Sequence, residues 1–171
     1  MARFVDRLVQ DGHDSIIDVI VDPDESDLID VRQRRLRHHW WAAFRERNAL
    51  PLRRDFNASF LHDIVDYLAV VEKVAGTLRY ATFGKGVAQA YGRDLTGTTV
   101  DQLPLPVANL FRSMYHLAEA KLVPVFTRHA PITGPAVRNW LRLIVPLGKD
   151  DSAVVTHFMT CNVPVGGEVR L

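Results

Sequence analysis

The sequence predicts an α+β domain in which a five-stranded antiparallel sheet carries helices on one face, with a further helix at the N-terminal end. Periodic segments follow one another in the order helix, two strands, several short helices, a long helix and three strands. Turn residues separate the strand candidates, and the crossover from the second strand to the third passes through all the middle helices. An antiparallel sheet with helices gathered on one face satisfies this order.

Composition sets the broad class. The chain has 171 residues, which suits one domain with an appendage, and its formal net charge of +1 favours neither nucleic acid nor a membrane surface as a partner. A single cysteine, Cys161, permits no internal disulfide and fits a cytoplasmic protein. No signal peptide is recognisable, and no stretch approaches the ~20 apolar residues of a membrane helix.

Charge is distributed unevenly along the chain. Residues 1–30 hold nine acidic residues against two arginines, a net charge of −7, whereas residues 31–54 hold eight arginines against one glutamate, a net charge of +7. We therefore predict an acidic N-terminal arm (1–27) followed by a basic helical segment (28–55). The arm either docks on the basic helix, in one chain or across a dimer, or is a flexible tail beside a solvated helix face.

The basic segment is the first predicted helix, over residues 27–48, with Ser26 or Asp27 as its N-cap and Pro51 closing the segment. Its apolar residues follow helical spacing along one stripe, so the helix should lie on another surface. If that surface is the sheet of a second copy, an apolar set on this helix forms a dimer interface, and tryptophan suits such a place. The candidates are Leu36, Trp40, Trp41 and Phe44.

The next segments change period. Residues 67–74 and 77–84 are β-prone and joined at Ala75-Gly76, which predicts a hairpin. Residues 87–91 suit one or two helical turns. A strongly periodic helix follows over about 106–122, and Pro124 ends it. The last three strands are predicted over 123–129, 139–147 and 153–163, the final two as a hairpin.

Three stretches also resemble a known family. Residues 36–54 (LRHHWWAAFRERNALPLRR), 78–97 (LRYATFGKGVAQAYGRDLTG) and 139–150 (NWLRLIVPLGKD) are similar, in order and spacing, to the PAS-like family common in alphaproteobacteria and long catalogued as a domain of unknown function. Arg54 before Asp55, and Gly84 after the second strand, match the family pattern. The resemblance covers roughly residues 28–163.

The resemblance implies a PAS core over 56–165, followed by a short tail (166–171). It implies a sensory or interaction domain that is usually dimeric through an N-terminal helix laid on the sheet. Such domains hold a small ligand, a cofactor or nothing between sheet and helices. No ligand or cofactor is carried over residue by residue, because fold analogy alone cannot supply one.

A PAS cavity would be lined from the sheet and the middle helices. The side chains that we expect there are Arg79, Tyr80, Tyr91, Phe111, Met114, Arg142 and His157. Arg142 has a simpler interpretation, because it lies between Leu141 and Leu143, and strand alternation then favours a solvent-facing side chain.

Metal and catalytic sites are not predicted. His38 and His39 point about 100° apart on a helix, which disfavours a shared metal. His116 falls on the polar side of the long helix, which favours a surface position over a haem ligand. The sequence contains no G-x-S-x-G, H-E-x-x-H or P-loop motif, so we predict no enzyme activity.

The function predicted from the sequence is a PAS sensory or interaction domain that forms a homodimer and binds a small molecule or a signalling protein. The alternative is a small cone-shaped α+β enzyme, of the isomerase or dehydratase type, with a pocket under the sheet. That alternative expects Arg142 or His157 to pair with a buried carboxylate.

Overall fold

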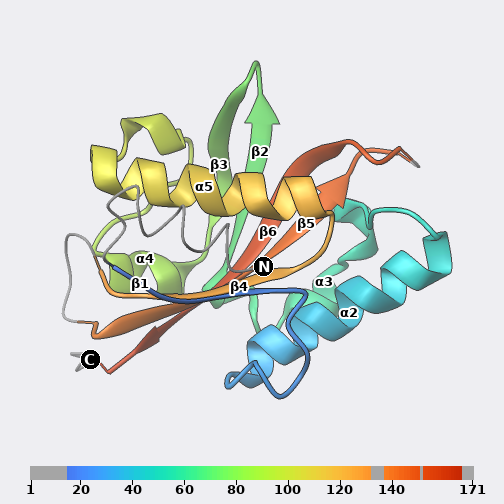
Figure 1. The fold of residues 1–171 in the computed structure, drawn as a ribbon, viewed down its shortest axis with the longest axis horizontal. Coiled ribbons are helices and arrows are strands. Elements are labelled where there is room, and N and C mark those ends of the chain that lie inside the picture. Colours follow the sequence, from blue (N-terminus) through green and yellow to red (C-terminus); the bar gives the residue numbers. More distant parts are fainter. Residues whose placement is uncertain (1–14, 132–136, 151, 167–171) are drawn as a thin grey trace.

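The fold is described from a computed structural model that covers residues 15–131, 137–150 and 152–166 (Figure 1). The predicted tail (166–171), apart from Gly166, and most of the predicted acidic arm lie outside the described residues. Within the described part, no helix has the length and hydropathy needed to cross a bilayer.

The element order matches the prediction, with one strand added at the start. The helices are α2 (Val31–Arg47), α3 (Ala58–Leu61), α4 (Lys85–Tyr91) and α5 (Leu105–Lys121), with 3-10 turns η1 (Arg53–Asp55), η2 (Val65–Tyr67) and η3 (Val100–Gln102). The strands are β1 (Ile16–Val21), β2 (Leu68–Val74), β3 (Thr77–Phe83), β4 (Val125–His129), β5 (Asn139–Gly148) and β6 (Val155–Val165).

All described strands belong to one antiparallel sheet in the order β1-β4-β5-β6-β2-β3. The five strands β2 to β6, with the helices inserted between β3 and β4, form an α+β fold in the predicted element order. The predicted count of five strands is wrong, because β1 pairs with the outer edge of β4. This strand comes from the segment that we expected to be an acidic arm, and it covers an edge that would otherwise expose unpaired backbone groups.

Both predicted hairpins are confirmed. In the first, Val74 pairs with Thr77, which leaves Ala75 and Gly76 as a two-residue loop. Both loop residues have positive φ, 48° and 82°, as the twist of a tight hairpin requires. Gly84, which directly follows β3, must be glycine for a different reason: a Cβ there would lie 2.5 Å from the backbone oxygen of Asp66.

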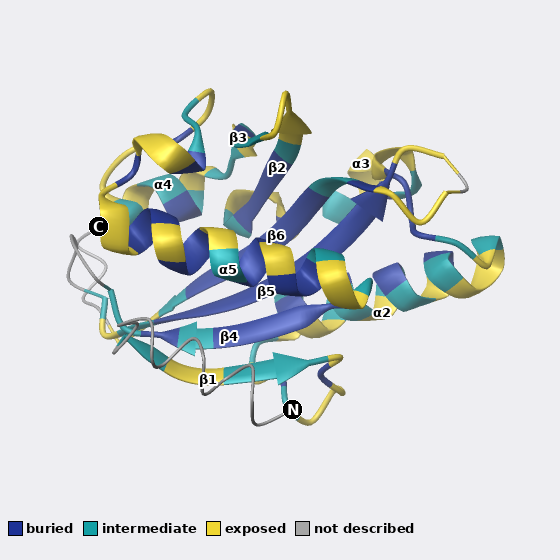
Figure 2. Ribbon diagram, turned by 45° about the horizontal axis from the view of Figure 1, so that its top comes forward, coloured by how far each residue is buried: buried dark blue, intermediate teal, exposed yellow. Residues whose placement is uncertain are grey.

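Helices cover both faces of the sheet: α4 and α5 lie on one face, as predicted for the core, and the N-terminal helix α2 covers the other. On one face, the α5 rings of Tyr115 and Phe111 contact Phe158 of β6 and the guanidinium of Arg142 of β5. The other face receives α2, which contacts β5 and β6. In Figure 2, α5 lies across the sheet, and β5 is buried almost throughout. Continuous burial of a strand indicates that both of its faces are covered.

Strand alternation then assigns each residue of β5 and β6 to a side. Arg142 and its cross-strand partner Asn162 lie on the α5 side, together with Phe158. The residues between them, including Leu143 and Cys161, lie on the α2 side. We use these two names, the α5 side and the α2 side, for the two faces of the sheet.

Helix α2 begins four residues later than its predicted start. Asp30 is its N-cap, and its carboxylate accepts a hydrogen bond from the backbone NH of Arg32. The segment before it lies along the helix, since Arg34 donates to the backbone oxygens of Leu28 and Ile29, and Arg37 donates to that of Pro23. Basic side chains of α2 therefore hold the end of the acidic segment chiefly through backbone carbonyl groups.

Trp40 connects α2 to the sheet. Its side chain is completely buried, and its indole Nε1 donates a 2.7 Å hydrogen bond to the backbone oxygen of Pro146 in β5. The neighbouring Trp41 is half-buried, and its Nε1 has no hydrogen-bond partner among the described residues. Of the two indole NH groups, only that of Trp40 thus has a hydrogen-bond partner among the described residues.

This difference predicts unequal effects of the same substitution. Trp40→Phe should lower the free energy of unfolding by about 1–3 kcal/mol more than Trp41→Phe, because only the first leaves a buried carbonyl without its donor. Urea denaturation of both variants measures this directly. Equal losses would show that the Trp40 hydrogen bond does not stabilise the docking of α2.

Candidate functional site

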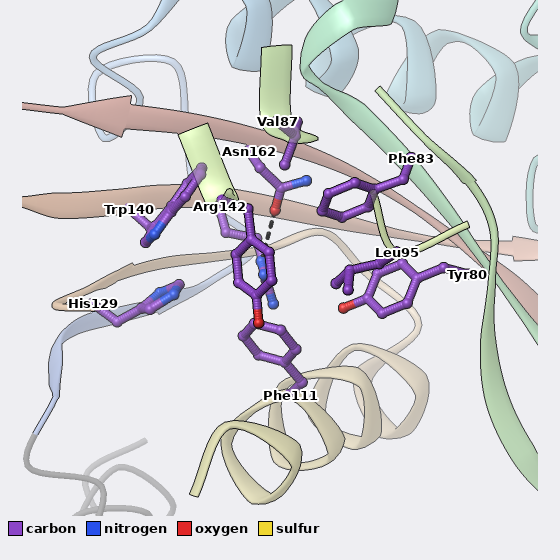
Figure 3. Close-up of a pocket in the computed structure, with 10 residues that line it drawn as sticks. Tyr80, Phe83, Val87, Leu95, Phe111, His129, Trp140, Arg142 and Asn162 are labelled. Atoms are coloured by element: carbon purple, nitrogen blue, oxygen red, sulfur yellow. Dashed lines mark hydrogen bonds between the residues drawn. The ribbon is translucent and has the colours of Figure 1, made fainter. Parts of the chain in front are cut away.

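A small cavity lies on the α5 side of the sheet, between the strands and helices α4 and α5 (Figure 3). Aromatic and apolar side chains form most of its wall, and a few polar groups point into it. It is lined by Tyr80, Phe83, Val87, Tyr91, Leu95, Phe111, His129, Trp140, Arg142 and Asn162. Its free space is about 20 Å³, which is roughly what one water molecule requires.

A second space of about 20 Å³ adjoins the first, beside Val107, Leu110 and Pro131. The two spaces share four wall residues, Tyr91, Phe111, His129 and Trp140. The two small spaces therefore adjoin across these four side chains. Tyr91 is only half-buried, so its ring is the shared wall with the most freedom to move.

Arg142 is the charged group of the cavity. Arg142 is 8 % exposed. Its guanidinium carbon lies 3.8 Å from the centre of the Phe111 ring, and its Nε donates a 2.8 Å hydrogen bond to Oδ1 of Asn162. One terminal nitrogen is buried and has no hydrogen-bond partner. Among the residues that the structure describes, no carboxylate forms an ion pair with Arg142.

Other buried polar groups near Arg142 are also unsatisfied. The hydroxyls of Tyr80 and Tyr115 are neighbours, yet neither makes a hydrogen bond of acceptable geometry with a described residue. Nδ1 of His129 is likewise unpartnered. Figure 3 shows the Tyr80 hydroxyl and the His129 ring directed toward the cavity from opposite sides of Arg142. Native interiors rarely leave several polar groups unpaired in one place, so such a cluster indicates a missing partner.

Burial changes the acidity of these groups. Desolvation, with a smaller contribution from the positive charge of Arg142, lowers the pKa of His129 to about 3. Desolvation also raises the pKa of Tyr80 and the pKa of Tyr115. At neutral pH the histidine and both tyrosines are therefore uncharged, and Arg142 supplies the charge of the cavity.

The structure brings together four of the seven predicted cavity residues. Tyr80, Tyr91, Phe111 and Arg142 line the cavity. For Arg142, the expectation of a solvent-facing side chain is wrong, because alternation on a sheet covered on both faces directs it into the interior. Met114 is buried in the core but lines neither space.

The remaining two candidates lie on the other face of the sheet. Arg79 is exposed and pairs with Glu72, which is directly opposite His157 in the neighbouring strand. Since these three residues occupy one cross-strand row on the α2 side, neither Arg79 nor His157 reaches the cavity. Desolvation lowers the pKa of the half-buried His157.

Sequence analysis missed several cavity residues, above all His129, Trp140 and Asn162. Alternation within β4, β5 and β6 could have placed each of them on one of two faces. Which strands pair, and hence which side chains meet Arg142, depends on contacts between distant segments: His129 is directly opposite Trp140, and Asn162 directly opposite Arg142.

The helix proposed as a dimer interface packs within its own chain. Leu36 and Trp40 are completely buried there, so neither is available to a partner in this arrangement. Trp41 and Phe44 are half-buried; the Phe44 ring stacks on Trp40, and the Trp41 ring meets it edge-on. Dimerisation stays a prediction, and of the four residues only these two reach the surface.

The histidine and cysteine predictions concern positions outside the cavity. His116 is exposed on α5, as predicted. Cys161 is completely buried on the α2 side, and burial raises the pKa of its thiol. Within the described ranges, no group of three or more His, Cys, Asp or Glu side chains is placed to hold a metal ion.

Comparisons with known proteins give little beyond these observations. No protein-family model matches the chain, and no curated protein matches it either. The resemblance to the alphaproteobacterial PAS-like family therefore stays a prediction. Among solved structures, the chain is similar to a light-oxygen-voltage domain from a study of its mechanism with a flavin analogue. That similarity has 12 % sequence identity and a TM-score of 0.46, and covers 65 % of this chain and 87 % of that one.

The buried histidine predicts a specific dependence of stability on pH. The folded-state pKa of His129, about 3, lies below its unfolded value of about 6.5. The unfolded chain therefore binds a proton first as the pH falls, and stability is lost progressively below about pH 6.5. Lowering the pH from 7 to 5.5 should therefore reduce the free energy of unfolding by about 1 kcal/mol through this residue.

Urea denaturation of wild type and of His129→Gln at the two pH values tests this expectation. The variant should lose less stability than wild type over that interval. His116→Gln is the matched control, because that histidine is exposed, and it should leave the pH dependence unchanged. Identical pH profiles for wild type and His129→Gln would contradict the burial of a neutral His129.

Proposed function

We propose that this chain is a PAS-type sensory domain that binds a small molecule between its sheet and helices α4 and α5. The observation that carries the proposal is the cluster of buried, unsatisfied polar groups around Arg142 in an aromatic-lined cavity. Leaving such groups unpaired costs free energy of folding, about 1–3 kcal/mol for each group. A ligand that supplies the missing partners recovers part of that cost.

The elements around the cavity suit a sensor. Wall residues come from β3, α4, α5, β4, β5 and β6, so one ligand contacts segments that are far apart in the sequence. Tyr91 ends α4, and Gly92 follows it with a φ of 89°. A ligand that displaces the Tyr91 ring would shift the end of this short helix, which offers a route from the cavity to the surface. The change would then be passed on through protein contacts, including those of a homodimer or a signalling partner.

The enzyme alternative receives less support from the geometry. It expects Arg142 or His157 to be paired with a buried carboxylate. In the described part of the chain, Arg142 is hydrogen-bonded to the amide of Asn162, and His157 to the hydroxyl of Thr156. We therefore propose a binding role for the cavity and assign no catalytic residue.

Native mass spectrometry of the freshly purified protein, combined with a thermal-shift screen of a chemically diverse set of small molecules, tests this proposal. We expect a non-covalent mass increment, or a rise in melting temperature with at least one compound, and either effect should be lost in Val87→Phe. Val87 is 3 % exposed and lines the cavity, so the larger side chain fills the space. The mass spectrum also reports the number of subunits.

Gln89→Phe is the matched control, because it adds the same ring to an exposed position of α4. It should bind as wild type does. A protein that carries no bound molecule and responds to no compound of the screen would contradict the ligand-binding proposal. Binding that survives unchanged in Val87→Phe would place the ligand elsewhere.

A further inference from the structure

The charge of Arg142 has no counter-charge in the described interior. Its nearest interactions are an amide oxygen, that of Asn162, and an aromatic ring, that of Phe111. A buried arginine is normally paired with a carboxylate, because removal of a charge from water is costly and only an opposite charge offsets most of it. The missing partner of Arg142 is therefore an anion.

The remaining groups limit how much negative charge the cavity accepts. Among the described residues, the ionisable side chains that surround Arg142 are His129, Tyr80, Tyr91 and Tyr115. Burial favours the neutral form of His129, so it adds no second positive charge. A single positive charge matches a monoanion, whereas a phosphate or a dicarboxylate would leave negative charge buried without a partner.

The shape and bonding of the site favour a carboxylate among monoanions. Planar guanidinium groups bind the two oxygens of a carboxylate through parallel hydrogen bonds. The neighbouring hydroxyls of Tyr80 and Tyr115 lie on the same side of the sheet, and neither has a partner beyond the other hydroxyl among the described residues. Beyond these groups the wall is apolar and aromatic, with Phe83, Val87 and Leu95 on one side of Arg142 and Trp140 on the other.

We propose that the cavity binds a small monocarboxylic acid, with its carboxylate on Arg142 and its apolar body among the aromatic rings that separate the two adjoining spaces. This inference rests on the proposed ligand-binding function and names the chemical class of the ligand. Because each space holds about one water molecule, the acid is small, and the shared rings of Phe111 and Tyr91 turn to admit it.

Matched pairs of acids and amides provide the test. Butyrate, benzoate and phenylacetate are compared with butyramide, benzamide and phenylacetamide, which have nearly the same shape but no charge. Isothermal titration calorimetry at constant ionic strength measures each affinity. At least one acid should bind the wild type about tenfold more tightly than its amide, as expected of hydrogen bonds to a charged group.

Variants then locate the charge that is responsible. Arg142→Met keeps the length of the side chain and removes the charge, so the preference for acid over amide should disappear. Arg142→Lys keeps a charge without the planar fork, and should retain only part of the preference. Arg79→Met is the control, because Arg79 is an exposed arginine on the other face of the sheet and should bind acids as wild type does.

The outcomes separate this inference from the function on which it rests. If a neutral or cationic compound binds the wild type but not Val87→Phe, and no acid binds more tightly than its amide, the sensory proposal stands and the carboxylate inference is overturned. Acids that bind no better than their amides to wild type overturn the inference even if Arg142→Met does not fold. An acid preference that Arg79→Met removes and Arg142→Met keeps would also overturn it.

Discussion

The burial of β5 on both faces is the constraint on which the other features depend. A strand that is hydrophobic and buried along its length needs a covering layer on each side. Helix α5 supplies one layer and α2 the other, with the Trp40 indole hydrogen-bonded to the backbone of β5. The basic, tryptophan-rich helix is thus part of the core of its own chain, and Arg34 and Arg45 are among the positions that it exposes to solvent.

Two-sided burial also explains how a polar cavity comes to lie inside an ordinary hydrophobic domain. Alternation divides each central strand between a side packed by α2 and a side packed by α5. Tyr80, Tyr115, Thr127, His129 and Arg142 each have a buried polar atom without a partner. Register places Thr127, His129, Arg142 and Tyr80 on the α5 side, where Tyr115 of α5 meets them.

These unsatisfied groups work against stability, and their concentration around Arg142 on one side of the sheet is the observation on which the proposed function rests. Charged and polar groups held in a low-dielectric interior interact strongly with a ligand that complements them, because little water competes. The same burial suppresses the charge of His129 and leaves Arg142 as the charged group of the cavity. In the ligand-binding role that we propose, stability and ligand selection oppose one another at this site, as is common where a protein keeps an unsatisfied site for its function.

The sequence by itself determined the local features: the Ala75-Gly76 hairpin, the long amphipathic helix, the last three strands and the surface position of His116. Each follows from residues that are close along the chain, where period, turn chemistry and capping act. Tertiary structure alone decided that β1 joins the sheet, that α2 covers the second face and that Arg142 lies inside with Asn162 and His129. A period of two tells which residues share a face, but only the packing of distant segments decides whether that face meets solvent, a helix or a cavity.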